Sequence, residues 1–238
     1  MHLYQRVKHP VASMLCMISS TSLALSNDGA SRWQYESTVL WESRYVDSGR
    51  DDLEEGGIFS GELMCAHDHV SFGAWMGVAD SEQYEEYNLF AGYGFRLGQV
   101  DLELAYTHLV FHPDSDNDDE LSIAAEVEVI GGWIAAATGV YSFEADGCFV
   151  EVSLSYPLAV YDDRLWLTPV LLAGADFGYR TAGHDGLNHI QIMIEAAYQL
   201  SERSILLAYV AHSDAQDDVQ REGLGDVSWI GIGLNTRF

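Results

Sequence analysis

The feature of this chain that most constrains its fold is the alternation of side chains in its last residues. One side of the extended segment 226–238 is almost entirely apolar and the other is mixed. The first carries Ile230, Ile232, Leu234, Thr236 and Phe238, and the second Trp229, Gly231, Gly233, Asn235 and Arg237. Successive side chains of a β-strand point to opposite faces. Lipid outside and a polar lumen inside favour this pattern in a transmembrane β-barrel. An edge strand of a soluble sandwich is the alternative for this segment alone.

Both ends of the chain carry features of an exported protein. The terminal Phe238 resembles the signature by which barrel-assembly machinery recognises bacterial outer-membrane proteins, although Thr236 replaces the usual second aromatic. At the other end, two basic residues precede the mostly apolar run 11–25, and Ala24 and Ser26 suit cleavage before Asn27. The run is shorter than the ~20 apolar residues of a spanning helix. We therefore predict a cleaved signal peptide at 1–26 and a single barrel domain at 27–238.

The same alternation recurs along the rest of the chain. In segment 188–200, for example, Ile190, Ile192 and Ile194 oppose His189 and Glu195. A helical period would mix these two sets. Applied throughout, the rule gives candidate strands at about 32–46, 57–66, 69–79, 84–97, 99–111, 120–130, 132–144, 148–160, 165–180, 188–200, 203–213 and 226–238. Most reach the ~9–11 residues that a tilted strand needs to cross a bilayer. The sequence therefore predicts an all-β, transmembrane, antiparallel up-and-down barrel of about 12 strands.

The segments between these strands alternate between long and short. With the N-terminus in the periplasm, the long connections 47–56, 112–119, 181–187 and 214–225 would lie outside the cell and the short turns inside. This asymmetry is typical of outer-membrane barrels. Aromatic side chains on the predicted outward faces suit the girdles at the membrane interfaces. They are Tyr35, Trp41, Tyr45, Tyr93, Trp133, Tyr141, Tyr156, Tyr179 and Tyr198.

The chain is strongly acidic. It has 37 Asp and Glu residues against 11 Lys and Arg, for a formal net charge of -26. Loss of the signal peptide removes Arg6 and Lys8 and no acid, so the mature chain would be still more negative. This balance argues against nucleic acid as a partner and favours attraction of cations. A salt-adapted proteome would give the same total charge, so the positions of the acids are more informative than their number.

On the predicted register, acids outnumber arginines on the inward faces. The acids are Glu36, Glu42, Glu62, Glu86, Asp101, Glu103, Glu126, Glu128, Glu151, Asp176 and Glu195, with Arg32, Arg44, Arg96 and Arg180 as counterions. Unpaired carboxylates are costly in a dry interior, so we expect them to be hydrated, protonated or bound to cations. This predicts a porin-like channel for passive diffusion of small polar or cationic solutes through an acidic lumen. A closed structural or adhesion barrel, filled by side chains, is the alternative.

Two groups of residues resemble metal sites only weakly. Asp114, Asp116 and Asp118 match the start of a calcium loop, but Asp119 stands at the turn glycine and Ala125 at the twelfth position. A solvated acidic loop that binds divalent cations loosely beside lipopolysaccharide is the simpler interpretation. Cys65, His67 and His69 are candidate soft ligands, but a turn between them would separate their faces. We expect no cofactor. Cys65 and Cys148 fall near opposite rims and are expected to be free thiols.

Enzymatic motifs are also weak in this sequence. His69 and Ser71 lie on one face, as a lipid-hydrolysing barrel would require of a base and nucleophile, but at the predicted periplasmic end and inside the barrel. Acyl chains would not reach them there. The sequence has no serine elbow, phosphate-binding loop or HExxH motif. We therefore expect no catalytic activity, and a lipid-active outer-membrane enzyme is the least favoured alternative.

Part of the chain resembles a known family. The segments 86–93 (EYNLFAGY) and 100–106 (VDLELAY), followed by His112-Pro113 and Glu120-Leu121, are similar to a family of uncharacterised proteobacterial proteins described as outer-membrane β-barrels, of about the same length. The resemblance covers roughly the middle third of the chain. It recurs over the short segment 43–45, and the chain differs from the family at 46–51. It implies a barrel in the bacterial outer membrane, with lipid, lipopolysaccharide and the assembly machinery as partners. It implies no activity and no functional residues.

Overall fold

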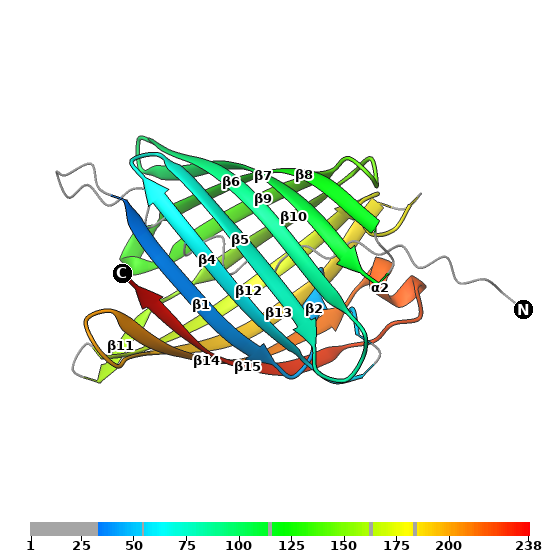
Figure 1. The fold of residues 1–238 in the computed structure, drawn as a ribbon. Coiled ribbons are helices and arrows are strands. Elements are labelled where there is room, and N and C mark those ends of the chain that lie inside the picture. The colour runs from blue at the N-terminus through cyan, green and yellow to red at the C-terminus, as the bar shows by residue number, and fades with distance from the viewer. Residues whose placement is uncertain (1–32, 54, 114–115, 162–163, 183–184) are drawn as a thin grey trace, which may run out of the picture.

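The computed structural model describes residues 33–238 apart from 54, 114–115, 162–163 and 183–184. These residues form a closed, antiparallel barrel of twelve strands (Figure 1). The strands are β1 (Gln34–Glu42), β4 (Ile58–His67), β5 (Val70–Ala79), β6 (Glu85–Leu97), β7 (Val100–His112), β8 (Asp116–Glu128), β9 (Ile134–Ser142), β10 (Gly147–Ser155), β12 (Leu165–Phe177), β13 (Asp185–Gln199), β14 (Ser204–Ala215) and β15 (Val227–Arg237). The predicted fold class is confirmed. The predicted signal peptide lies outside the described residues.

Each barrel strand pairs with its neighbours in the chain, and the last strand closes on the first. The pairing of β1 with β15 runs from Glu36↔Arg237 to Glu42↔Gly231. The Phe238 N–H adds a hydrogen bond of 3.0 Å to the Tyr35 carbonyl, while the Phe238 side chain is 70% exposed. A short strand, β11 (Leu158–Tyr161), continues the edge of β10 beyond Pro157 and pairs with β12. Closure gives each of the twelve barrel strands a partner on both sides, as a bilayer requires.

The two faces of the wall have opposite character. In β15, Ile230 and Ile232 are 52% and 51% exposed, whereas the inward Trp229 is only 6% exposed. Large apolar side chains are exposed in the same way around the rest of the barrel, and the buried residues include many polar ones. This inverts the usual arrangement of a soluble protein, as lipid on the outside demands.

No helix in the described part of the chain is long and apolar enough to span a membrane.

The connections divide the barrel into two ends. The long-loop end carries the connections 43–57, 80–84, 113–115, 143–146, 178–184 and 216–226, and the last of these holds the short helix α2 (Asp217–Arg221). The short-turn end carries the tight turns, a single 3₁₀ turn at Ile130–Gly132, and both ends of the barrel sequence (Figure 1). The expected loop at 112–119 is shorter than predicted. Strand β8 begins at Asp116, because Asp116 and Asn117 pair with Phe111 and Val110 of β7.

The first connection has a structure that we did not predict from the sequence. The expected long connection at 47–56 is at the long-loop end, where Val46–Asp47 (β2) and Arg50–Asp51 (β3) form a hairpin whose residues are largely buried. Ser48 and Gly49 have φ of 48° and 75°, the positive values that a two-residue type I′ turn needs. We call residues 43–57 the inward hairpin. It packs at the long-loop end and fills that part of the barrel.

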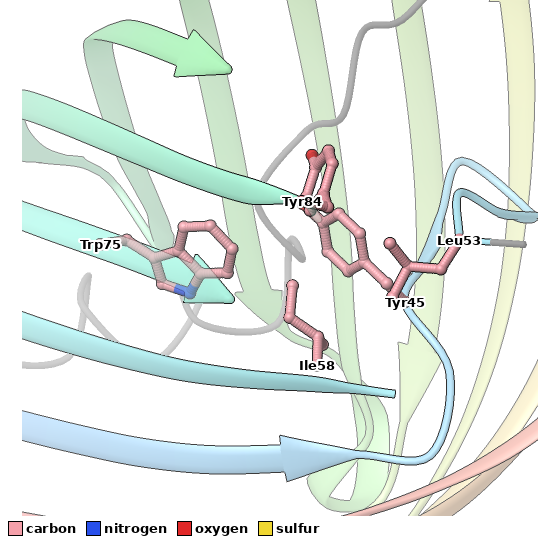
Figure 2. Close-up of a cluster of buried hydrophobic side chains, with 5 residues drawn as sticks. All are labelled: Tyr45, Leu53, Ile58, Trp75 and Tyr84. Carbon is pink, nitrogen blue, oxygen red and sulfur yellow. The ribbon is translucent and has the colours of Figure 1, made fainter. Parts of the chain in front are cut away.

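Two aromatic residues predicted to face lipid are also inside. Tyr45 and Tyr179 are fully buried, and their hydroxyls donate to Glu86 and Glu120. Both residues follow the ends of their strands, β1 and β12, so the alternation that predicted an outward face no longer applies to them. A buried phenol needs a hydrogen-bond partner, and the inward carboxylates supply it. Figure 2 shows Tyr45 beside Tyr84 and Leu53, with Ile58 and Trp75 completing an apolar cluster under the hairpin.

Candidate functional site

The predicted lumen acids fall into two groups, and the first group lies toward the long-loop end. These carboxylates are held by protein donors. Glu86 accepts hydrogen bonds from Tyr45 (2.7 Å), Tyr84 (2.8 Å) and Asn88 (2.7 Å). Asp176 accepts the backbone N–H groups of residues 179–181, so it shapes the turn after β12 and does not face open space. These hydrogen bonds offset the free-energy cost of burying the carboxylates.

The second group lies toward the short-turn end and has few partners. No hydrogen bond or ion pair to another described residue is found for the side chains of Glu62, Glu103, Glu126 and Glu195. All four are on inward positions of their strands, and Glu126 and Glu195 line one cavity. A carboxylate without a protein donor needs water or a cation. This half of the lumen is therefore suited to hydrated ions.

Several other predicted positions are near the ends of the barrel strands. Asp101 pairs with Arg96 at 2.5 Å, and Glu128 is exposed at the short-turn end. Arg44 pairs with Asp51 at the surface of the inward hairpin. Glu36 is inward but accepts hydrogen bonds from Asn235 (2.5 Å) and Arg237 (3.2 Å). Arg32 lies outside the described residues.

Two buried arginines fasten the inward hairpin to the barrel. Arg50 at the hairpin tip donates to Glu222 at 2.8 and 3.0 Å and to Asn188 at 2.7 Å. Arg180, after β12, pairs with Asp47 at 3.1 Å and with Asp52. The hairpin thus contacts the connections 178–184 and 216–226, and both arginines are committed to carboxylates of the same end. We call these two sets of ion pairs the arginine clamp.

The charged partners of the clamp shift one another's pKa values. Burial alone would lower the pKa of Arg180, but the adjacent Asp52 and Asp47 carboxylates outweigh it and hold the pKa above its usual value. Burial would likewise raise the pKa of Glu222, yet hydrogen bonds from Arg50 and Thr181 hold it below its usual value. Opposite charges at close range favour the charged forms of both partners. Loss of Arg180 would therefore leave the buried Asp47 without its counterion.

Inward glycines let rings lie flat along the wall. Tyr209 of β14 crosses Gly231 of β15 and donates to Glu42 of β1, and a Cβ at Gly231 would lie 2.2 Å from the Tyr209 ring. His189 of β13 covers Gly174 of β12 in the same way, 3.5 Å from Glu151 of β10. Each glycine sits between its two partners in the strand register. These ring–carboxyl pairs therefore span three adjacent strands.

Two cavities meet inside the barrel at Glu151 and Leu172. The first, of about 60 Å³, lies beneath the inward hairpin and is lined by Asp47, Gly49, Glu42, Glu151 and Gln191, among others. The second, of about 150 Å³, continues past Glu151 to Glu126 and Glu195. Since a water needs roughly 10–15 Å³ of such space, both can hold several waters. Inward carboxyls thus border both cavities, and Glu151 borders the two together.

The weaker metal candidates do not gather into sites. Asp114 lies outside the described residues, whereas Asp118 is in β8 and accepts from Ser142 and from the backbone N–H groups of Asp119 and Glu144. Cys65 and Cys148 are free thiols, as expected. His69 contacts the Gly94 carbonyl and the Tyr93 ring. In the part of the chain that the structure describes, no group of three or more His, Cys, Asp or Glu side chains is placed to hold a metal ion.

The serine and histidine considered for catalysis have different positions and different contacts. Ser71 is buried on the inward face of β5, and His69 is in the preceding turn with the contacts given above. A different pair, His212 and Ser228, is in contact on the exposed face at 2.8 Å. No carboxylate among the described residues bonds to this histidine, and the nearby Asp214 accepts from Gln216. A base oriented by an acid, which activates serine in hydrolases, is not formed there.

Sequence reasoning missed the residues that organise the first cavity. The local sequence does not single out Arg50, Asn188, His189 and Tyr209, because each acts through partners far away in the chain. One local signal was present. Ser48-Gly49 is a two-residue turn dipeptide that predicts a tight hairpin inside the first connection. Nothing in the local sequence predicts that this hairpin folds into the barrel.

No family model and no curated protein matches this sequence, so the resemblance noted for the middle of the chain stays a hypothesis. Solved structures do match. A KdgM porin in complex with disordered oligogalacturonate is 10% identical with a TM-score of 0.56, covering 86% of this chain and 99% of that one. An outer membrane channel from Pseudomonas putida F1 is 11% identical, with a TM-score of 0.54 and coverage of 90% and 98%. A NanC porin is 8% identical, with a TM-score of 0.54 and coverage of 85% and 98%. The chain therefore has the fold of outer-membrane porins and channels.

Proposed function

We propose that this protein is a porin-like channel of the bacterial outer membrane that passes small polar or cationic solutes by diffusion. The observation that carries the proposal is the set of inward carboxyls Glu103, Glu126, Glu151 and Glu195, which have few protein partners and of which the last three line cavities inside the barrel. Fixed negative charge in a low-dielectric channel concentrates cations and repels anions. The fold shared with porins supports the same function.

The inward hairpin bears on the choice between an open channel and a closed structural barrel. A buried hairpin fastened by the arginine clamp narrows the long-loop end, as a closed structural barrel would also require. The carboxyls of Glu42, Asp47 and Glu151 on the wall of the cavity beneath it favour a constriction over a dry plug, because buried carboxyls need water. Conductance of the purified protein across planar bilayers distinguishes the two functions.

The selectivity test neutralises the acids that have no partner. In the triple variant Glu103→Gln, Glu126→Gln and Glu195→Gln, we expect the cation-to-anion permeability ratio to fall by about threefold or more, since each lost charge weakens the lumen potential. The measurement is the reversal potential in a salt gradient. The matched control removes three exposed charges with Glu55→Gln, Glu144→Gln and Glu202→Gln, which salt screens within ~8–10 Å.

Three results would count against the proposal. An unchanged reversal potential in the lumen variant would reject these acids as the selectivity filter. Complete absence of conductance in the well-folded parent protein would favour the closed structural barrel. A parent that conducts anions in preference to cations would contradict the role of the acidic lumen directly.

A further inference from the structure

Buried carboxyls from three strands of the barrel face the inward hairpin at Asp47. Glu86 of β6, Glu120 of β8 and Glu151 of β10 each interact electrostatically with Asp47. Glu86 and Glu120 also interact with one another. All four residues are at most 9% exposed. We call the three glutamates the wall carboxyls. The hairpin holds an acidic side chain against them at the long-loop end.

The arginines of this end are committed to other acids. Arg180 pairs with Asp47 at 3.1 Å and with Asp52, and Arg50 pairs with Glu222. Among the described residues, neither arginine forms an ion pair with a wall carboxyl. The titratable and charged groups that face the wall carboxyls are Tyr45 and Asp47 of the hairpin, Tyr84 before β6, Asp118 of β8, Tyr179 and Arg180 after β12, and His189 of β13.

This arrangement couples the position of the hairpin to protons. Like charges in a space of low dielectric cannot all be carried at once. A buried carboxyl without a counterion is more stable protonated, whereas the same carboxyl in water ionises. The hairpin in its buried position therefore retains protons that would be lost if it moved out and admitted water. The state that binds more protons loses stability as the pH rises. Higher pH thus favours release of the hairpin.

The groups outside the strands either act in the same direction or do not titrate just above neutral pH. Burial raises the pKa of Asp52 above its usual value, and the attraction of Arg180 offsets only part of this. Burial would also raise the pKa of Glu222, but hydrogen bonds within the clamp hold it below its usual value, so this acid keeps its charge. Burial raises the pKa of the Tyr45 and Tyr179 phenols above its usual value, so both stay neutral.

We propose that the inward hairpin is a gate that opens as the pH rises above neutral. Ionisation of the wall carboxyls repels Asp47 and draws water beneath the hairpin, so that its residues 46–52 leave the barrel and the channel widens. The arginine clamp holds the hairpin in place at neutral pH, because the charge of arginine does not change over this range. The widening rests on the proposed function, whereas the release of the hairpin does not require conduction.

The experiment measures how fast a thiol on the hairpin reacts. In a background of Cys65→Ser and Cys148→Ser, the variant Ser48→Cys places the thiol on the turn, where the native residue is 7% exposed. The folded, full-length protein in detergent is treated with N-ethylmaleimide, which is uncharged. Its rate is divided by the rate for Glu144→Cys, an exposed loop position, at the same pH. This rate ratio removes the ordinary dependence of thiol reactivity on pH.

We expect the rate ratio to rise about tenfold or more between about pH 7 and about pH 9, a window in which carboxyls and histidines of ordinary pKa do not titrate. Conductance across planar bilayers should rise over the same window. Conductance alone is not a sufficient test, because ionised lumen acids also attract cations without any movement of the hairpin.

Replacing the wall carboxyls by amides, which cannot ionise, tests their role. In the triple variant Glu86→Gln, Glu120→Gln and Glu151→Gln, the rate ratio should stay low at both pH values. Each single replacement should reduce the rise, so the test does not depend on folding of the triple variant. The matched control neutralises three inward acids toward the short-turn end and should respond as the parent does; it carries Glu103→Gln, Glu126→Gln and Glu195→Gln. Heat-modifiable mobility confirms that each variant is folded.

The possible outcomes separate the gate from the channel. A rate ratio that does not change with pH in the parent would overturn the gate, and so would an equal rise in the parent and in the triple variant of the wall carboxyls. Cation-selective conductance with an unchanged rate ratio would reject the gate and leave the channel. A rising rate ratio without conductance at either pH would support release of the hairpin and reject the channel.

Discussion

Inward glycines at positions 174 and 231 give the lumen its side-chain architecture. Each lies between a ring and a carboxyl on the flanking strands, and lets the ring lie flat against the wall. A Cβ would push the ring toward the axis and break its contact with the acid. The absence of a side chain at these two positions is therefore needed for the ring–carboxyl contacts.

Replacing Gly231 by Ala should displace Tyr209 and break its hydrogen bond to Glu42, because the new Cβ would lie 2.2 Å from the ring. Leaving a buried carboxyl without its donor should lower the free energy of unfolding by about 1–3 kcal/mol. Urea unfolding in detergent measures this. Gly139→Ala is the control, since its nearest neighbour is 3.7 Å away, and should stay within about 0.5 kcal/mol. Equal stability of the two variants would contradict the role of Gly231.

The inward hairpin is the element that decides how open the barrel is. Its turn geometry is local, but its position depends on the arginine clamp, whose partners come from the connections 178–184 and 216–226. Removing one partner of a buried ion pair is far more costly than removing one at the surface. The hairpin is therefore held by charge pairing as well as by the apolar cluster in Figure 2.

Replacing Arg180 by Met should release the hairpin, because Asp47 and Asp52 then lose their common cation. We expect a loss of about 3–5 kcal/mol in the free energy of unfolding if the hairpin stays in place, and a larger single-channel conductance if it leaves. Denaturation and bilayer recordings together separate these outcomes. Arg44→Met, which breaks only the surface pair with Asp51, should cost at most about 1 kcal/mol. Unchanged stability and conductance in Arg180→Met would show that the clamp does not hold the hairpin.

The two ends of the barrel differ in the length of their connections. The long connections and the inward hairpin share one end, and the tight turns share the other (Figure 1). Barrels of the outer membrane place short turns in the periplasm. We therefore expect the long-loop end to face the medium, with the inward hairpin as the first constriction that an entering solute meets.

Cysteine labelling of intact cells tests this orientation. In a background of Cys65→Ser and Cys148→Ser, an impermeant thiol reagent should label Glu144→Cys and Asp217→Cys, whose positions are exposed at the long-loop end. Glu202→Cys, in a turn at the short-turn end, should react only after the cells are permeabilised. The reverse pattern would invert the orientation, and labelling of all three positions on intact cells would argue against the membrane location.

The strands and their two faces were predictable from the sequence, whereas the contents of the lumen were not. Alternation is a local property, because lipid and lumen act on neighbouring residues of the same strand, so Ile230 and Trp229 reveal their faces without knowledge of the fold. The position of the inward hairpin depends on contacts such as Arg50 with Glu222, which are far apart in the chain and meet only after closure. Tyr45 and Tyr179 follow the strand ends, where alternation stops, and their buried positions are set by the acids they reach.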